Sequence, residues 1–175
     1  MHGMETHLPA PIKKPALKPS AGGDRQFVTF SVGRHSFGLP IEDVIEINRS
    51  LDITPVPMAP PYVAGLINLR GHILTSIDLA QRLGIPDTRE QKDRTLHNVV
   101  VGSREEPVSL IVETIGDVCT IPREQIAPAP ERIEGIERRF VKNVCKLPDR
   151  LLVILDTKDF EEPDVEDKRR GLSAP

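Results

Sequence analysis

The residue types that could carry acid–base or metal chemistry are spread thinly along this sequence. No two of the five histidines are spaced i, i+4, and no glycine-rich loop opens a helix after a strand. A metal site or a phosphate-binding loop needs such spacing. Paired carboxylates such as Glu105-Glu106 fall where we expect solvent, which is not typical of a general acid–base couple. The sequence predicts a protein that is not an enzyme, with no catalytic residues and no metal or cofactor.

The two cysteines, Cys119 and Cys145, lie far apart in the sequence, and neither has a closely spaced partner. Disulfide frameworks and zinc sites use more cysteines at closer spacing. A free cysteine packs well as a small apolar residue, and thiols persist in a reducing compartment. We therefore expect both to serve as core residues of a cytoplasmic protein.

One cation stands out, Arg70 in the segment Asn68-Leu69-Arg70-Gly71. An Arg-Gly pair between two strands can be explained as a hairpin turn alone. The alternative is an ion pair, because the planar guanidinium suits a fixed carboxylate partner. Glu46 is the candidate partner.

The elements that would position these side chains are short strands. Apolar residues alternate with polar ones over 28–32 and 37–41, either side of a Gly33-Arg34-His35 turn, and again over 73–79. This period of two predicts strands, including a hairpin over 28–39. Residues 78–83 and 124–126 could each make a short helical turn. Short strands separated by Gly and Pro favour small barrels over βαβ units.

An internal repeat organises these strands. The segment 43–47 resembles 117–121, the segment 63–78 resembles 141–156, and the hairpin 28–39 has a counterpart over 99–112. Two copies in the same strand order imply two similar barrels with a groove between them. The copies also separate the two interpretations of Arg70. The second copy has Pro148 at the position of Arg70 and Thr120 at that of Glu46, so the turn does not require arginine. We expect Glu46 and Arg70 to form a surface pair that shapes a docking site.

Composition limits the partners. The formal net charge is −3, and aromatic residues make up 3% of the chain, which disfavours nucleic acid as a partner. No apolar run approaches the roughly 20 residues that span a bilayer, and no secretory signal is evident. We expect a cytoplasmic protein without membrane insertion. Residues 1–24 are rich in Pro and Lys and predict a disordered tail. Residues 163–175 predict an acidic, flexible C-terminus.

Four groups of residues resemble the CheW family of chemotaxis coupling proteins. They are Phe27–Gly38, Ile41–Ile47, Pro60–Gly71 with its Asn-Leu-Arg-Gly motif, and Ile77-Asp78-Leu79, and the match continues through 108–118. Glu113 and Ser109 depart from the family, which usually has Asp and Gly there. The resemblance covers about residues 25–160.

The resemblance implies a mostly β fold of two intertwined five-stranded SH3-like barrels, with short helices between strands and at the C-terminus. The CheW-like domain then spans 25–162, with the first barrel mainly in 25–96, the second mainly in 97–150, and the last strand and helix in 151–162. It also implies a non-enzymatic adaptor at receptor arrays beneath the inner membrane. The partners would be the regulatory domain of a CheA-type histidine kinase and the cytoplasmic tip of chemoreceptors. Four residues match partner-binding positions: Val44, Glu46, Gly65 and Arg70.

An SH3-like peptide-binding scaffold in another pathway is the alternative. Such a scaffold needs an aromatic-lined groove for Pro-rich ligands, for which a single Tyr is poor provision.

Overall fold

The computed structural model describes residues 23–86 and 95–161, which form eleven strands and a few short helices. The expectations for the N-terminal tail and for residues 163–175 therefore lie outside the described residues, apart from Gly23 and Asp24. The strands are β1 Arg25–Val32, β2 His35–Pro40, β3 Val44–Arg49, β4 Val63–Leu69, β5 His72–Asp78, β6 His97–Gly102, β7 Pro107–Val112, β8 Thr114–Ile121, β9 Ile126–Pro128, β10 Val141–Lys146 and β11 Leu151–Leu155.

The helical segments are single turns or little more. They are α1 Leu79–Leu83, α2 Lys158–Glu161 and the 3₁₀ turns η1 Ile41–Asp43, η3 Arg123–Gln125 and η4 Arg138–Phe140. The expected turns near residues 78–83 and 124–126 are confirmed as α1 and η3. Asp78 caps α1 by accepting a hydrogen bond from the Gln81 N–H at 3.1 Å, and Gly84 ends it in a left-handed conformation.

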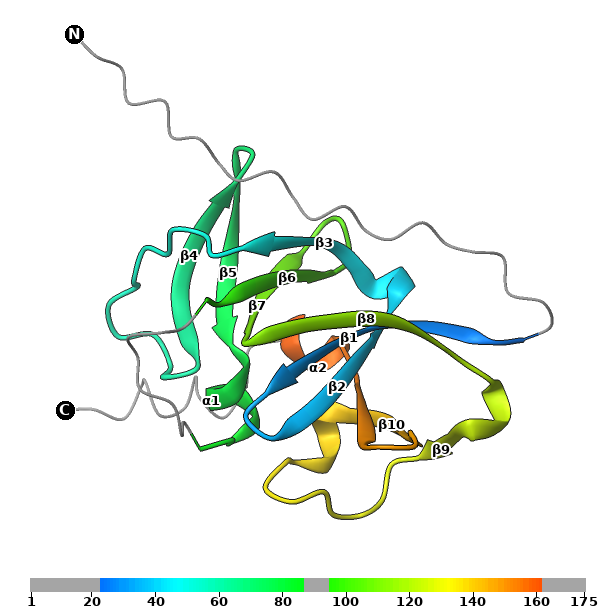
Figure 1. The fold of residues 1–175 in the computed structure, drawn as a ribbon. Helices are drawn as coiled ribbons and strands as arrows, with labels where there is room; N and C mark the ends of the chain where they lie inside the picture. The colour runs from blue at the N-terminus through cyan, green and yellow to red at the C-terminus, as the bar shows by residue number, and fades with distance from the viewer. Residues whose placement is uncertain (1–22, 87–94, 162–175) are drawn as a thin grey trace, which may run out of the picture.

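Two sheets contain all the strands (Figure 1). One has six strands in the order β8-β1-β2-β11-β10-β9, and the other has five in the order β3-β6-β7-β5-β4. Each is mixed, because β2 pairs in parallel with β11 and β5 in parallel with β7, while the other pairs are antiparallel. The mostly β fold of two intertwined SH3-like barrels is confirmed.

The intertwining comes from an exchange of hairpins. The β1–β2 hairpin of the first repeat pairs with β8 and β11 of the second, and the β6–β7 hairpin of the second pairs with β3 and β5 of the first. The sheets therefore do not coincide with the two halves of the sequence. The division at residues 96 and 150 stays a prediction about how the chain is partitioned.

The two sheets share one large core. Val28, Phe30 and Val32 from one sheet lie in the same buried cluster as Val99, Val101 and Leu110 from the other. A smaller cluster lies on the outer face of each sheet: Phe27, Ile121, Cys145, Leu152 and Ile154 on one, and Ile67, Leu74 and Val100 on the other. Cys145 is fully buried there, with Cys119 packed beside it. Tertiary structure thus brings together two thiols that the sequence separates.

Candidate functional site

The turn between β4 and β5 holds Arg70 in an unusual backbone conformation. Arg70 has φ 53° and Gly71 has φ 86°, with Leu69 and His72 paired across the ladder. Two consecutive positive φ values define a type I′ hairpin turn, which favours Asn or Gly at its first central position. The Asn68 Oδ1 atom closes the turn by accepting a hydrogen bond from the Gly71 N–H at 2.9 Å. Arginine is thus an uncommon choice at residue 70, and turn geometry does not explain it.

The predicted pair between Glu46 and Arg70 is confirmed as a contact. The Arg70 Nη1 atom lies 3.4 Å from Glu46 Oε2. The other carboxylate oxygen, Oε1, accepts a hydrogen bond from Asn48 Nδ2 at 2.6 Å, and Asn48 is buried. The Glu46 side chain is 16% exposed, whereas that of Arg70 is 60% exposed. Glu46 is therefore fixed to the sheet, and it holds a guanidinium that remains available at the surface.

This pair lies in a groove of about 510 Å³, which we call the Arg70 groove. Its lining combines apolar and charged side chains: Ile45, Leu69, Ile73, Leu74, Val100, Glu46, Arg70, Arg104 and Glu105, with His72 and Pro107. Ile73 is 62% exposed and Ile45 is 37% exposed. Large apolar side chains exposed together beside charges are typical of a surface that binds another protein.

Sequence reasoning did not single out Ile45, Ile73 or Arg104. The alternation over 73–79 puts Ile73 on the same face as the buried Ile77. However, the β4–β5 hairpin extends beyond the core, so Ile73 is exposed at its tip. The exposure of Ile73 therefore depends on the length of the β4–β5 hairpin, and the internal repeat does not give that length.

Val44 lies in the core. Its side chain is 1% exposed and belongs to the large buried cluster, at the point where η1 ends and β3 begins. Its side chain therefore stabilises the start of β3, two residues before Glu46, instead of forming surface.

Gly65 has a packing role. It has φ 152° and lies at an irregularity in the β4–β5 register. A Cβ atom there would meet the Thr54 carbonyl oxygen at 2.2 Å and the Ile53 Cγ2 atom at 2.7 Å. The missing side chain lets residues 53–54 approach β4, where Thr54 and Leu66 exchange two backbone hydrogen bonds of 2.8 Å. This segment helps cover the outer cluster that contains Leu74 and Val100.

The repeat equivalence needs one correction. Phe37 lies opposite Val153 and Val108 lies opposite Thr75, so Val101 of β6 corresponds to Phe30 of β1, and Val99 corresponds to Val28. Glu46 lies between Val44 opposite Val101 and Ile47 opposite Val99, and it therefore corresponds to Asp117, which lies between Ile115 opposite Phe30 and Val118 opposite Val28. The alignment of Glu46 with Thr120 was wrong, because Thr120 pairs with Gln26 near the other end of β1. A β-bulge in each ladder shifts the register, which ungapped sequence matching cannot detect. The second copy therefore has a carboxylate, Asp117, at this position, and what it lacks is the arginine, because Pro148 corresponds to Arg70.

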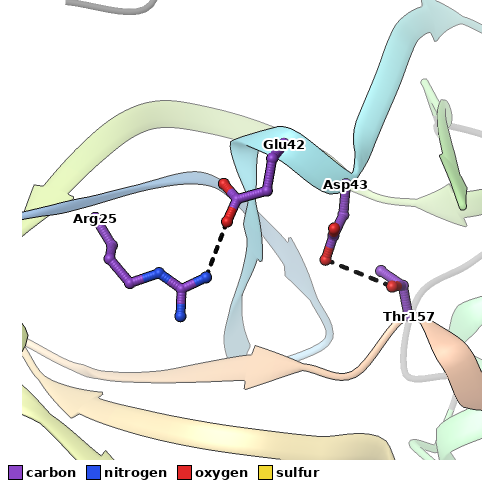
Figure 2. A network of polar contacts seen from close by, with 4 residues as sticks. All are labelled: Arg25, Glu42, Asp43 and Thr157. Carbon is purple, nitrogen blue, oxygen red and sulfur yellow. Dashed lines mark hydrogen bonds and ion pairs between the residues drawn. The ribbon is translucent and has the colours of Figure 1, made fainter. Parts of the chain in front are cut away.

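The 3₁₀ turn η1, just before β3, is tied to both halves of the chain (Figure 2). Arg25 Nη2 lies 2.9 Å from Glu42 Oε1, and the Thr157 hydroxyl donates to Asp43 Oδ2 at 3.5 Å. Burial alone would raise the pKa of Glu42, but its own backbone N–H, Arg25 and Lys142 outweigh burial and hold that pKa below its ordinary value. Burial and the neighbouring Glu42 charge raise the pKa of Asp43.

Within residues 23–86 and 95–161, no group of three or more His, Cys, Asp or Glu side chains could hold a metal ion. Over the same residues, no helix is long and apolar enough to cross a membrane.

Comparison with known proteins places these features in a family context. Residues 26–162 match the family model described as the CheW-like domain. The chain is 34% identical over 143 residues to the probable chemotaxis protein CheW of Rhizobium etli, covering 81% of this chain and 90% of that protein. It is 32% identical to the chemotaxis protein CheW of Treponema pallidum, covering 79% and 84%. The crystal structure of the scaffolding protein TtCheW from Thermoanaerobacter tengcongensis is similar, with a TM-score of 0.69, 32% identity and coverage of 76% of this chain and 89% of that one.

Proposed function

The chain belongs to the CheW-like domain family and is a chemotaxis adaptor, and from this premise we propose that it couples chemoreceptors to a CheA-type histidine kinase by docking to both. The partners would be the regulatory domain of the kinase and the cytoplasmic tip of the receptor. The protein would act in the cytoplasm, at receptor arrays beneath the inner membrane.

The observation that carries this proposal is the Arg70 groove. Exposed Ile45 and Ile73 offer apolar contact area, and Arg70 offers a guanidinium whose direction is set by Glu46. Buried apolar anchors usually supply most of the affinity at a protein interface, and a charge beside them sets register and orientation. We assign direct partner contact to Arg70 and Glu46.

Val44 and Gly65 would act on the groove indirectly. Val44 fixes the start of β3, and Gly65 admits the segment that packs over Leu74 and Val100. Changes at these two residues would weaken docking by displacing the groove and would also lower the stability of the fold.

Coupling of this kind needs no bond to be made or broken. An adaptor that holds kinase and receptor on one small body raises their effective concentration and fixes their relative orientation. We therefore propose that the protein acts without catalysis.

The alternative of a scaffold for Pro-rich peptides is not favoured. Such grooves are lined by exposed aromatic side chains. All five Phe residues are buried, and the single Tyr, Tyr62, is partly buried and stacks against the Arg82 guanidinium at 4.1 Å.

Co-purification tests the proposal. The full chain is incubated with the regulatory domain of a CheA-type kinase and with a receptor signalling domain, and retention of each is measured. We expect retention of both by the wild type, and failure to retain either would contradict the proposal.

Charge exchange tests the assignment to the pair. Glu46→Arg and Arg70→Glu should each reduce retention, and the double exchange should partly restore it, because the ion pair is re-formed with reversed polarity. The exposed pair of Arg34 and Glu134 offers a matched control, since it lies outside the groove. The same exchange there should leave retention unchanged. Absence of rescue by the double exchange would contradict the assignment.

A further inference from the structure

A second recess, on the six-stranded sheet, occupies the place that corresponds to the Arg70 groove. The Arg70 groove is bounded by the β6–β7 hairpin, the edge strand β3 and the turn between β4 and β5. The second recess is bounded by the β1–β2 hairpin, the edge strand β8 and the turn between β10 and β11. We call it the hydroxyl recess; it has about 160 Å³ and is lined by Thr29, Phe30, Ser31, Ser36, Thr114, Gly116 and Arg150.

Strand register aligns three of these hydroxyl groups. Ser31 of β1 lies opposite Ser36 of β2 on one side and opposite Thr114 of β8 on the other. Residues directly opposite each other in an antiparallel ladder project from the same face, with Cβ atoms about 4.5–5.5 Å apart. Thr29 lies two residues before Ser31 and shares that face. Four hydroxyls from three adjacent strands are thus gathered in one recess.

Three of these hydroxyls are not used by the fold. Within the described part of the chain, the side chains of Ser31, Ser36 and Thr114 make no hydrogen bond to another protein group, whereas the Thr29 hydroxyl donates to the Asp117 carbonyl oxygen at 2.6 Å. A hydroxyl that the fold does not use can rotate to donate to a bound group.

Gly116 keeps the recess open. A Cβ atom at residue 116 would meet the Thr29 Oγ1 atom at 2.5 Å. Any larger residue would therefore push on Thr29 and fill space that the recess offers. The volume of about 160 Å³ exceeds the roughly 30 Å³ of one water molecule, so a group of several atoms fits.

The charge of the recess is positive. Arg150 is the one ionisable residue in its lining, so no carboxylate is among the described residues that form it. Arg150 Nη1 lies 3.2 Å from Asp149 Oδ2, but the Asp149 side chain is 71% exposed and outside the lining. By contrast, the lining of the Arg70 groove includes both Glu46 and Glu105. The two corresponding places thus differ in chemistry, one apolar with mixed charge and the other hydroxyl-rich with a cation.

We propose that the hydroxyl recess binds a small oxyanion, a phosphate or a carboxylate group, between the Arg150 guanidinium and the hydroxyls of Ser31, Ser36 and Thr114. A guanidinium can form paired hydrogen bonds with either group, and each hydroxyl adds a donor. This site shares no lining residue with the Arg70 groove. The test of oxyanion binding is therefore independent of the test of the coupling role.

Titration with sodium phosphate and, separately, with sodium acetate tests the proposal. Backbone amide NMR signals of the full chain are followed at neutral pH and constant ionic strength, with chloride as the balancing anion. We expect saturable shifts confined to residues 29–36, 114–116 and 150. Saturation by phosphate alone identifies a tetrahedral oxyanion site, and saturation by acetate identifies a carboxylate site.

Variants decide whether the recess is responsible. Arg150→Gln should weaken binding at least tenfold, and Ser31→Ala/Ser36→Ala should weaken it several-fold while leaving the other amide signals in place. Arg123→Gln removes an equal charge from an exposed residue outside the recess and should have little effect. Shifts that never saturate, or equal weakening by Arg123→Gln and Arg150→Gln, would overturn the proposal, because general attraction to a positive surface would then account for the data.

Discussion

At the scale of single residues, Arg70 has different effects on the stability of the fold and on docking. A left-handed backbone costs a residue other than Gly or Asn roughly 1–2 kcal/mol, whereas an exposed ion pair returns about 0–1 kcal/mol. Arg70 is held at φ 53°, and its own side chain stays 60% exposed in the contact with Glu46. The arginine is therefore a net cost to the fold, which argues that its guanidinium serves another purpose.

We predict that Arg70→Asn keeps or raises stability while it impairs docking. The free energy of unfolding should rise by up to about 1 kcal/mol, because Asn-Gly is the favoured type I′ pair. Retention of a docking partner should fall at least tenfold. Urea unfolding and a binding titration measure the two quantities on the same sample. A parallel loss of stability and binding would contradict this division of roles.

For Gly65 we predict the opposite effect of substitution on stability. Gly65→Ala adds a Cβ atom that clashes with the Thr54 carbonyl, at a φ that side chains rarely adopt. We expect it to lower the free energy of unfolding by more than about 3 kcal/mol, from strain and overpacking together. Gly71→Ala is the matched control, since its φ is 86° but no atom lies within 4 Å of the added Cβ. It should cost only about 1 kcal/mol. Equal losses in urea unfolding would show that the approach of residues 53–54 is unimportant.

At the scale of elements, η1 connects the two halves of the chain through two carboxylates with opposite effects. The pKa of Glu42 is lowered, so its ionised form stabilises the fold above its ordinary pKa, and this contribution is lost as pH falls through the lowered value. The pKa of Asp43 is raised, so its ionised form costs stability at neutral pH, and that cost is relieved as pH falls through the raised value.

We therefore predict opposite effects of two neutral substitutions in η1. At neutral pH, Glu42→Gln should lower the free energy of unfolding and Asp43→Asn should raise it, because the Asn oxygen can still accept from Thr157. Each change should stay below about 1 kcal/mol for such partly exposed groups and should shrink at acid pH, as the two carboxyl groups become protonated. Urea unfolding at both pH values, followed by circular dichroism, measures this. Effects of the same sign at neutral pH would contradict the assignment.

At the scale of the whole molecule, the exchanged hairpins make the two halves interdependent. Removal of β6 and β7 would leave β3 without a strand partner and would leave β4–β5 as an isolated hairpin, which is marginally stable at best in water. The shared core between the sheets would be exposed in either half.

We predict that fragments 23–96 and 97–161 are each unfolded alone and fold on mixing. Dispersion of their amide NMR signals, before and after mixing, measures this. The intact chain should unfold in a single transition, with hydrogen exchange of both sheets reporting the same free energy. A folded fragment, or two separate transitions, would mean that the halves are independent barrels.

The sequence by itself determined much of this protein. Alternation of apolar residues located the hairpins, because side chains in a strand point to opposite faces with a period of two. The internal repeat predicted two barrels, and comparison of its copies singled out Arg70, whose contact with the proposed partner Glu46 is now observed at 3.4 Å. These features depend on local pattern, which is written along the chain.

Tertiary structure decided the rest. Only the folded chain shows that hairpins are exchanged between the sheets, because the pairing of β2 with β11 and β5 with β7 depends on packing between distant segments. Only the fold places Val44 in the core and gives Gly65 its contact with Thr54, since burial and close approach arise from neighbours remote in sequence. Bulges in the ladders set which residues of the two copies correspond, and thereby which side chains form the Arg70 groove and the hydroxyl recess.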